Sequence, residues 1–137
     1  MMMLGGFAAT SPAQTSEQAL PVVIDGKMPI YPVMARCARI QGVVTVKVTT
    51  DGKKVTALGE GSGPPMLVKF VKENISTWEF LQHKPISFVT TFTYVIEGPY
   101  HCEYTNSSTV LHLPLEVRIS AEGLKTCDPA AEIKPHR

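Results

Sequence analysis

The residues best suited to chemistry in this sequence are three cysteines and four histidines. Thiolates and imidazoles bind zinc, and a cysteine beside a histidine can act as a nucleophile. A metal site would have to use His101, Cys102, His112 and Cys127, but their spacing matches no recognised ligand pattern. A catalytic pair of Cys37 with a histidine has no better support. We therefore predict no metal site, no cofactor and no catalytic residues.

The same cysteines can instead form a structural cross-link. Cys102 precedes the last strand-like segment and Cys127 follows it, so in an oxidising compartment we expect these two to form a disulfide. A loop of that size would stabilise the fold by roughly 3–4 kcal/mol in the chain-entropy estimate. Cys37 is expected on the core face of a short helix, as a buried free thiol. The other two pairings remain open.

A glycine-rich run, Gly59-Glu60-Gly61-Ser62-Gly63, could be interpreted as a phosphate-binding loop. Pro64 and Pro65 follow it directly and remove the N–H donors that such a loop would direct at a phosphate. We therefore interpret the run as a turn between a strand and a helix. No carboxylate pair, serine motif or cofactor fingerprint is visible elsewhere, so the sequence favours a non-enzymatic protein.

Composition limits the possible partners. The chain has 137 residues, with 13 basic and 12 acidic side chains, and this near balance argues against binding to nucleic acid. No apolar run reaches the roughly 18 residues of a membrane-spanning helix, so we expect no membrane anchor in this sequence. Residues 1–20 are interpreted as a signal-peptide remnant and linker, because Ser11-Pro12-Ala13 resembles a cleavage site; the alternative is a frayed terminus with no targeting role. We expect an exported protein.

Apolar periodicity predicts a helix followed by a hairpin in the first half of the domain. A short helix, Val33–Ile40, begins after Pro32 and stops at Gly42. The alternation of Val43–Val48 predicts a half-buried strand, and the tight turn Asp51-Gly52 leads into a weaker return strand.

A second helix and two long strands are expected to follow. Apolar residues at helical spacing between Pro64 and Phe80, including Phe70 and Trp78, predict an amphipathic helix. Ile86–Ile96 and Thr109–Ile119 both alternate like long strands. Pro114 lies inside the second and cannot donate to a ladder, which favours an edge position. We expect these two strands to pair.

The order of these features resembles the C-terminal domain of TonB-type energy transducers, over about residues 28–97. The resemblance is carried by the order and spacing of the whole set of residues. The resemblance rests on Tyr31, Pro32, Gly42, Asp51, Gly52, Ser62, Gly63, Leu67, Trp78 and Phe80.

The resemblance implies an α+β fold with two helices packed on an antiparallel sheet, here extended by an extra C-terminal strand. From the strand and turn pattern of the chain itself we expect a single domain over residues 21–124, with the extension at 98–124 and a polar tail at 125–137. The resemblance further implies a periplasmic, non-catalytic module that binds a short peptide of an outer-membrane receptor by adding a strand to its sheet edge. A homodimer is also possible for a sheet with long edge strands.

The sequence differs from the family in two respects. It contains neither the family's membrane helix nor its proline-rich linker, so the alternative is an exported binding module with no energy-transducing role. It also continues beyond the last family strand, and we expect the added strand to cover an edge. The candidate edge residues are Phe88, Thr90, Phe92 and Tyr94, or else Leu113, Leu115 and Val117.

Overall fold

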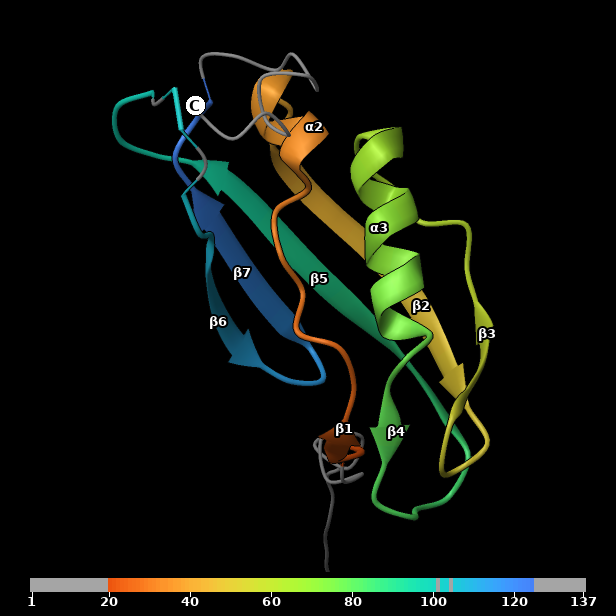
Figure 1. Ribbon diagram of the computed structural model, residues 1–137. Coiled ribbons are helices and arrows are strands. Elements are labelled where there is room, and N and C mark those ends of the chain that lie inside the picture. Colours follow the sequence, from red (N-terminus) through yellow and green to blue (C-terminus); the bar gives the residue numbers. More distant parts are fainter. Residues whose placement is uncertain (1–19, 101, 104, 125–137) are drawn as a thin grey trace, which may run out of the picture.

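The computed structural model describes residues 20–100, 102–103 and 105–124 of the chain, which form an α+β fold with two helices (Figure 1). Predicted features at residues 1–19 and 125–137, including the signal-peptide remnant and the polar tail, lie outside this part. The elements are β1 (Val23–Asp25), α2 (Val33–Cys37), β2 (Gly42–Thr50), β3 (Val55–Leu58), α3 (Pro65–Ile75), β4 (Glu79–Phe80), β5 (Ile86–Ile96), β6 (Ser108–His112) and β7 (Glu116–Ala121).

The main sheet has five strands in the order β3-β2-β5-β7-β6. All its neighbours are antiparallel except β5 and β7, which run parallel, so the sheet is mixed and not antiparallel as predicted. Both helices lie on the same face of this sheet (Figure 1). A separate two-stranded sheet pairs β1 with β4.

The hairpin of β2 and β3 closes as its turn chemistry predicts. The Asp51 carboxylate accepts hydrogen bonds from the main-chain N–H groups of Lys53 and Lys54, both at 2.9 Å, and these bonds lower the pKa of that carboxyl group. Gly52 has a φ of 108°, and a Cβ atom there would lie 2.4 Å from the His83 carbonyl oxygen. Only glycine fits this position.

The two helices are shorter than their apolar patterns suggested. α2 ends at Cys37, because Arg39 takes a φ of 59° and turns the chain towards β2. α3 ends at Ile75, and the last aromatic of the predicted helix, Phe80, lies in β4 instead. Phe70, which was predicted to face the core, is 41% exposed.

The core lies between the helices and the inner face of the main sheet. Trp78 stacks on Phe92 with ring centroids 6.3 Å apart, and Tyr31 meets Tyr94 edge-on at 5.1 Å. The predicted alternation of β5 is confirmed, since its apolar side chains on one face are buried. The buried apolar residues of the main sheet are Val44, Val46, Val48, Phe88, Phe92, Tyr94, Val117, Ile119 and Ala121.

The predicted single strand Thr109–Ile119 is wrong. The segment folds into a hairpin, in which β6 and β7 are joined by a turn at residues 113–115. Pro114 is buried in that turn rather than placed on an edge strand, which accords with its lack of a ladder donor. The expected pairing with β5 does occur, but only β7 makes it, in parallel register from Thr91–Glu116 to Ile96–Ala121.

Candidate binding edge

The main sheet ends in two edge strands of different character, β3 and β6. β3 pairs with β2 over three residues and its register is broken by a bulge between Thr49 and Thr50. Lys53 and Lys54 immediately precede it. Bulges, short length and lysines are the features that keep an edge strand from pairing with another chain. The β3 edge is therefore protected.

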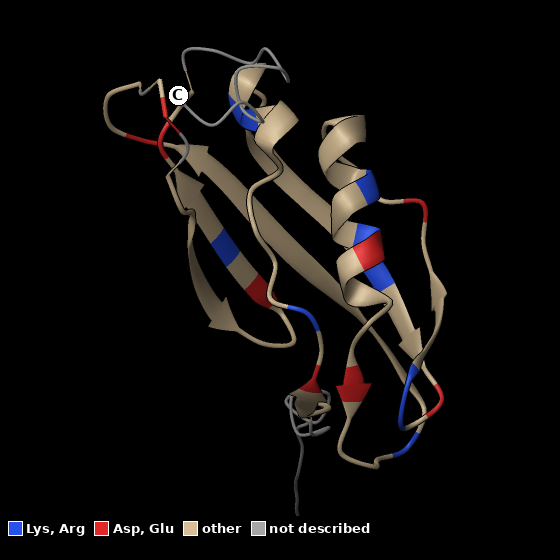
Figure 2. Cartoon of the chain, viewed as in Figure 1, with Lys and Arg blue, Asp and Glu red and all other residues tan. Residues whose placement is uncertain are grey.

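The β6 edge has neither a bulge nor a lysine. It pairs with β7 through five consecutive residue pairs with no irregularity. Its sequence Ser-Thr-Val-Leu-His contains no lysine, arginine, carboxylate or proline, and Figure 2 shows the strand tan, the colour of uncharged residues and histidine, along its length. Val110 is 50% exposed and Leu111 is 38% exposed. An exposed, regular and uncharged edge can accept another strand.

The hydrogen-bond alternation shows which groups of β6 face outward. The main-chain carbonyls of Leu115 and Ala121 accept hydrogen bonds at 2.8 Å from the N–H groups of Thr91 in β5 and of Glu97 just after it, so the main-chain groups of odd-numbered β7 residues face β5. Those of even-numbered residues face β6, where Arg118 opposes Val110. The N–H and C=O groups of Thr109 and Leu111 consequently point away from the sheet. They make no main-chain hydrogen bond to any other described residue.

An apolar hollow adjoins this edge on the helix side of the sheet. Its volume is about 240 Å³, and Leu111, Leu113 and Met28 contribute to its lining together with β1 and Trp78. Met28 is 61% exposed, so the apolar surface continues from the edge strand onto the segment that precedes α2.

The β6–β7 hairpin is held to the rest of the domain by polar contacts as well as by its strands. The Thr109 hydroxyl donates to the Pro29 carbonyl oxygen at 2.9 Å, and the Tyr31 N–H donates to the Ser107 hydroxyl at 3.3 Å. Arg36, fully buried, donates to the carbonyl oxygens of Glu122 and Thr105. The hairpin is thus an integral part of the fold. The sequence offered no sign that Arg36 would be buried.

The structure places the predicted edge residues in the interior of the sheet. β5 lies between β2 and β7, and its Phe88, Thr90, Phe92 and Tyr94 are buried against the helices. Thr90 also donates to the Pro114 carbonyl oxygen at 2.7 Å.

The second predicted set is also displaced from the edge. Val117 is buried on β7, between β5 and β6, while Leu113 and Leu115 lie in the hairpin turn. Both sets were therefore assigned wrongly, because the edge strand β6 and its neighbour β7 were predicted as one strand, Thr109–Ile119.

Most residues that carry the family resemblance are structural. The Tyr31 hydroxyl donates to the Ile40 carbonyl oxygen at 2.6 Å, and Pro32 caps α2. Ser62 bridges to Thr45 through main-chain and hydroxyl contacts. Gly63 has a φ of 130°, and a Cβ there would lie 2.6 Å from the Val43 carbonyl oxygen. Leu67, Trp78 and Phe80 are buried.

The buried tyrosines are unavailable for acid–base chemistry near neutral pH. Burial raises the pKa of Tyr31 to about 12, although the nearby charge of Arg36 acts in the opposite direction. Burial also raises the pKa of Tyr94, with a further contribution from Tyr31. Both hydroxyls therefore stay protonated and serve packing.

The cysteines differ from the prediction. Cys37, expected as a free thiol, is disulfide-bonded, and Cys102 is an exposed free thiol. The predicted disulfide between Cys102 and Cys127 is therefore wrong, because the thiol of Cys102 is free. Cys127 lies outside the described residues. The spacing of the cysteines in the sequence contains no signal that distinguishes a disulfide at Cys37 from one at Cys102.

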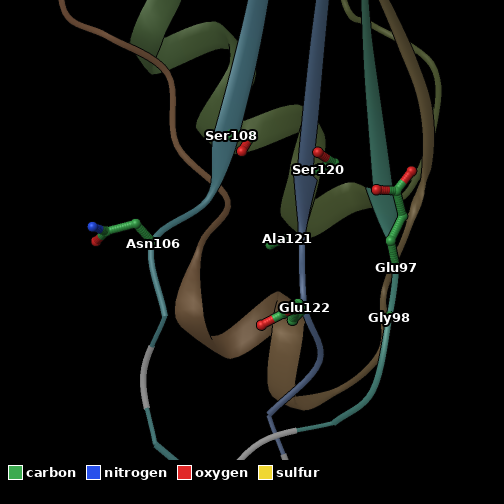
Figure 3. Close-up of a pocket in the computed structure, with 7 residues that line it drawn as sticks. All are labelled: Glu97, Gly98, Asn106, Ser108, Ser120, Ala121 and Glu122. Atoms are coloured by element: carbon green, nitrogen blue, oxygen red, sulfur yellow. The ribbon is translucent and has the colours of Figure 1, made fainter.

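A second hollow, of about 510 Å³, lies where β6 begins, at the ends of β5 and β7 (Figure 3). Figure 3 shows the side chain of Asn106 pointing outward from the strands, while the side chain of Glu97 points along the strands and not toward Asn106. Glu97 instead contacts Arg118 at 3.5 Å. In the part of the chain that the structure describes, no three histidine, cysteine or acidic side chains are grouped to hold a metal ion.

No helix within the described ranges is both long enough and apolar enough to cross a bilayer.

Comparisons with known proteins give no further assignment. No protein-family model matches the chain, and the search of curated proteins found no match.

Proposed function

We propose that this protein is a periplasmic, non-catalytic binding module of the TonB C-terminal type, which takes up an extended peptide segment of a partner protein along β6. The observation that carries the proposal is the outward alternation of Thr109 and Leu111 on a regular, uncharged edge strand. Strand addition gives affinity through main-chain hydrogen bonds, and neighbouring pockets give specificity. The hollow lined by Leu111 and Leu113 is such a pocket.

The family resemblance suggests a segment of an outer-membrane receptor as the partner. The second candidate keeps the same binding role but has no part in energy transduction. It is favoured by the position of β7, which occupies the side of β5 that we had expected a partner peptide to use. A partner would meet the added hairpin and not the strand shared with the family.

The proposal can be tested with fluorescent peptides that tile the periplasmic segments of outer-membrane receptors, with binding followed by anisotropy. Leu111→Pro removes one outward N–H donor and leaves the ladder to β7 intact, because the main-chain groups of Leu111 do not face β7. Leu111→Ala is the matched control, since it shortens the same side chain but keeps the donor.

We expect a binding peptide to lose most of its affinity for the Leu111→Pro variant and to retain more for Leu111→Ala. One lost hydrogen bond with an unpaired partner carbonyl corresponds to about 1–3 kcal/mol, or roughly 5- to 150-fold in affinity. Equal binding to both variants would show that the peptide does not use this edge, and the absence of any binding peptide would reject the receptor class.

A further inference from the structure

We infer that the apolar hollow beside β6 is a preformed pocket for one large, neutral, apolar side chain of the bound peptide, of leucine, methionine or phenylalanine size. This specificity rests on the proposed function, because it names the class of peptide that β6 would take up. The position of the hollow, the hydrogen bonds that fix its wall, and its size and charge carry the inference.

The hollow lies where a side chain of an added strand would project. Leu111 pairs with Val117, which is 1% exposed in the core, so the side chain of Leu111 lies on the helix side of the sheet. A residue placed opposite Leu111 on an added antiparallel strand projects to the same face, with its Cβ about 4.5–5.5 Å from that of Leu111. Leu111 also lines the hollow. The opposing residue therefore has the hollow directly beside it.

One wall of the hollow is the segment between β1 and α2, and hydrogen bonds hold this wall at two points. The Lys27 N–H donates to the Thr77 hydroxyl at 2.9 Å, and the Asn74 side-chain amide donates to the Lys27 carbonyl oxygen at 2.9 Å. Further along, the Pro29 carbonyl oxygen accepts from the Thr109 hydroxyl of β6 at 2.9 Å. The hollow is thus formed without a bound peptide, which lowers the ordering cost of binding.

The size of the hollow suits a single side chain. Its volume is about 240 Å³, below the roughly 300–1,000 Å³ of pockets that enclose small-molecule ligands. Seven of its ten lining residues are apolar, glycine not counted. An apolar side chain that enters it loses contact with water on most sides, and this burial favours binding.

The charges at the hollow favour a neutral occupant. The two charged lining residues are Asp25 and Lys27, which have opposite signs. Their charges largely cancel, so an ionised side chain would gain little net attraction there. It would also lose hydration in an apolar surrounding, which is costly for a charged group. A neutral apolar side chain incurs neither disadvantage.

The peptide side of this contact is tested with one synthetic series. Each member is a short fluorescent peptide of threonine and serine with one variable central residue, which is leucine, phenylalanine, alanine or lysine. Binding is followed by anisotropy. We expect the leucine and phenylalanine peptides to bind roughly 10- to 100-fold more tightly than the alanine peptide, because they bury more apolar surface. The lysine peptide should bind no better than the alanine peptide. Equal affinity across the series would overturn the inference.

The protein side is tested by filling the hollow. Ile24 lines it and is 60% exposed, so Ile24→Trp adds volume there without disturbing the core. Val22→Trp is the matched control, since Val22 is 55% exposed on the same segment but does not line the hollow. We expect Ile24→Trp to weaken the leucine peptide by roughly 10-fold and to leave the alanine peptide unchanged, whereas Val22→Trp should change neither. Equal effects of the two variants, or an equal loss for both peptides, would contradict the pocket.

The Leu111→Pro variant separates the pocket from the proposed function. If the peptides lose affinity for Leu111→Pro but the central residue makes no difference, strand addition stands and the pocket is wrong. If the leucine and alanine peptides differ while Leu111→Pro binds both unchanged, the pocket stands and strand addition fails. Absence of binding throughout the series would overturn the pocket. Self-association of the unmodified chain that Ile24→Trp abolishes would also overturn it, because a second copy would then cover the hollow.

Discussion

The guanidinium of Arg36 donates two hydrogen bonds to the main-chain carbonyl oxygen of Glu122, from Nε at 3.0 Å and from Nη2 at 2.8 Å. Arg36 lies in α2, and Glu122 directly follows β7. The contact therefore joins the helix of the first half to the strand added at the end of the sheet. It explains why the C-terminal hairpin is part of the fold and cannot be regarded as a detachable cover.

Replacing Arg36 tests this role. We expect Arg36→Met to lower the free energy of unfolding by about 2–4 kcal/mol, because it leaves the Glu122 and Thr105 carbonyl groups without their buried donors. Urea denaturation measures the effect. Lys69→Met on the exposed side of α3 is the control and should change stability little. Equal effects of the two substitutions would count against a structural role for Arg36.

The aromatic cluster gives a second stability prediction. Trp78 is 2% exposed, stacks on Phe92 and meets Phe80 edge-on at 6.3 Å. We expect Trp78→Ala to cost about 3–5 kcal/mol, measured by thermal or urea unfolding. Phe70→Ala, at a 41% exposed position, should cost much less. If Phe70→Ala proves as damaging as Trp78→Ala, the assignment of the core is wrong.

The burial of Tyr31 leads us to expect that the free energy of unfolding depends on pH in the alkaline range. Burial raises the pKa of Tyr31 to about 12 in the folded protein, from 10.0 in the unfolded chain. The neutral hydroxyl is thus favoured by folding, so its contribution is complete below pH 10 and is lost as the pH rises through 12.

The matching variant is Tyr31→Phe, which also removes the hydrogen bond to Ile40. We expect it to cost about 1–2 kcal/mol at pH 7. The difference from the unmodified protein should shrink above pH 10, as followed by urea unfolding across a pH series. A difference that stays constant up to pH 12 would mean that this hydroxyl ionises as easily in the fold as in the unfolded chain.

The state of the cysteines can be checked by alkylation of the native, unreduced protein. Iodoacetamide should modify Cys102, whose thiol is free and exposed, and should leave Cys37 unmodified until a reductant is added. Peptide mass mapping identifies the labelled site. Modification of Cys37 without reductant would contradict the disulfide at that position.

The first half of the fold could be predicted from sequence because its signals are local. The alternation of Val44, Val46 and Val48 and the Asp51-Gly52 turn both appear in the structure, and in the second half the long strand Ile86–Ile96 does so as well. The helix ends were less well predicted, since Phe80 continues the apolar spacing of α3 although it pairs in β4.

The candidate site could not be located from sequence, because no typical turn residue except Pro114 marks the break between β6 and β7. Leu111 to Ile119 alternates without a glycine, asparagine or aspartate to mark a turn, so the hairpin resembled one strand. Pro114 was the only signal, and it was compatible with either an edge or a turn. The parallel pairing of β7 and the burial of Arg36 depend on contacts between distant segments, which a local pattern does not contain.

The most direct measurement for the central claim is amide hydrogen exchange along β6, with and without a bound partner. In the unpaired chain the N–H groups of Thr109 and Leu111 should exchange quickly, and that of Val110 slowly, because only the latter faces β7. A partner strand should slow exchange at Thr109 and Leu111 and leave β3 unchanged. Protection that instead appears along β3, or no change at β6 on binding, would contradict the account.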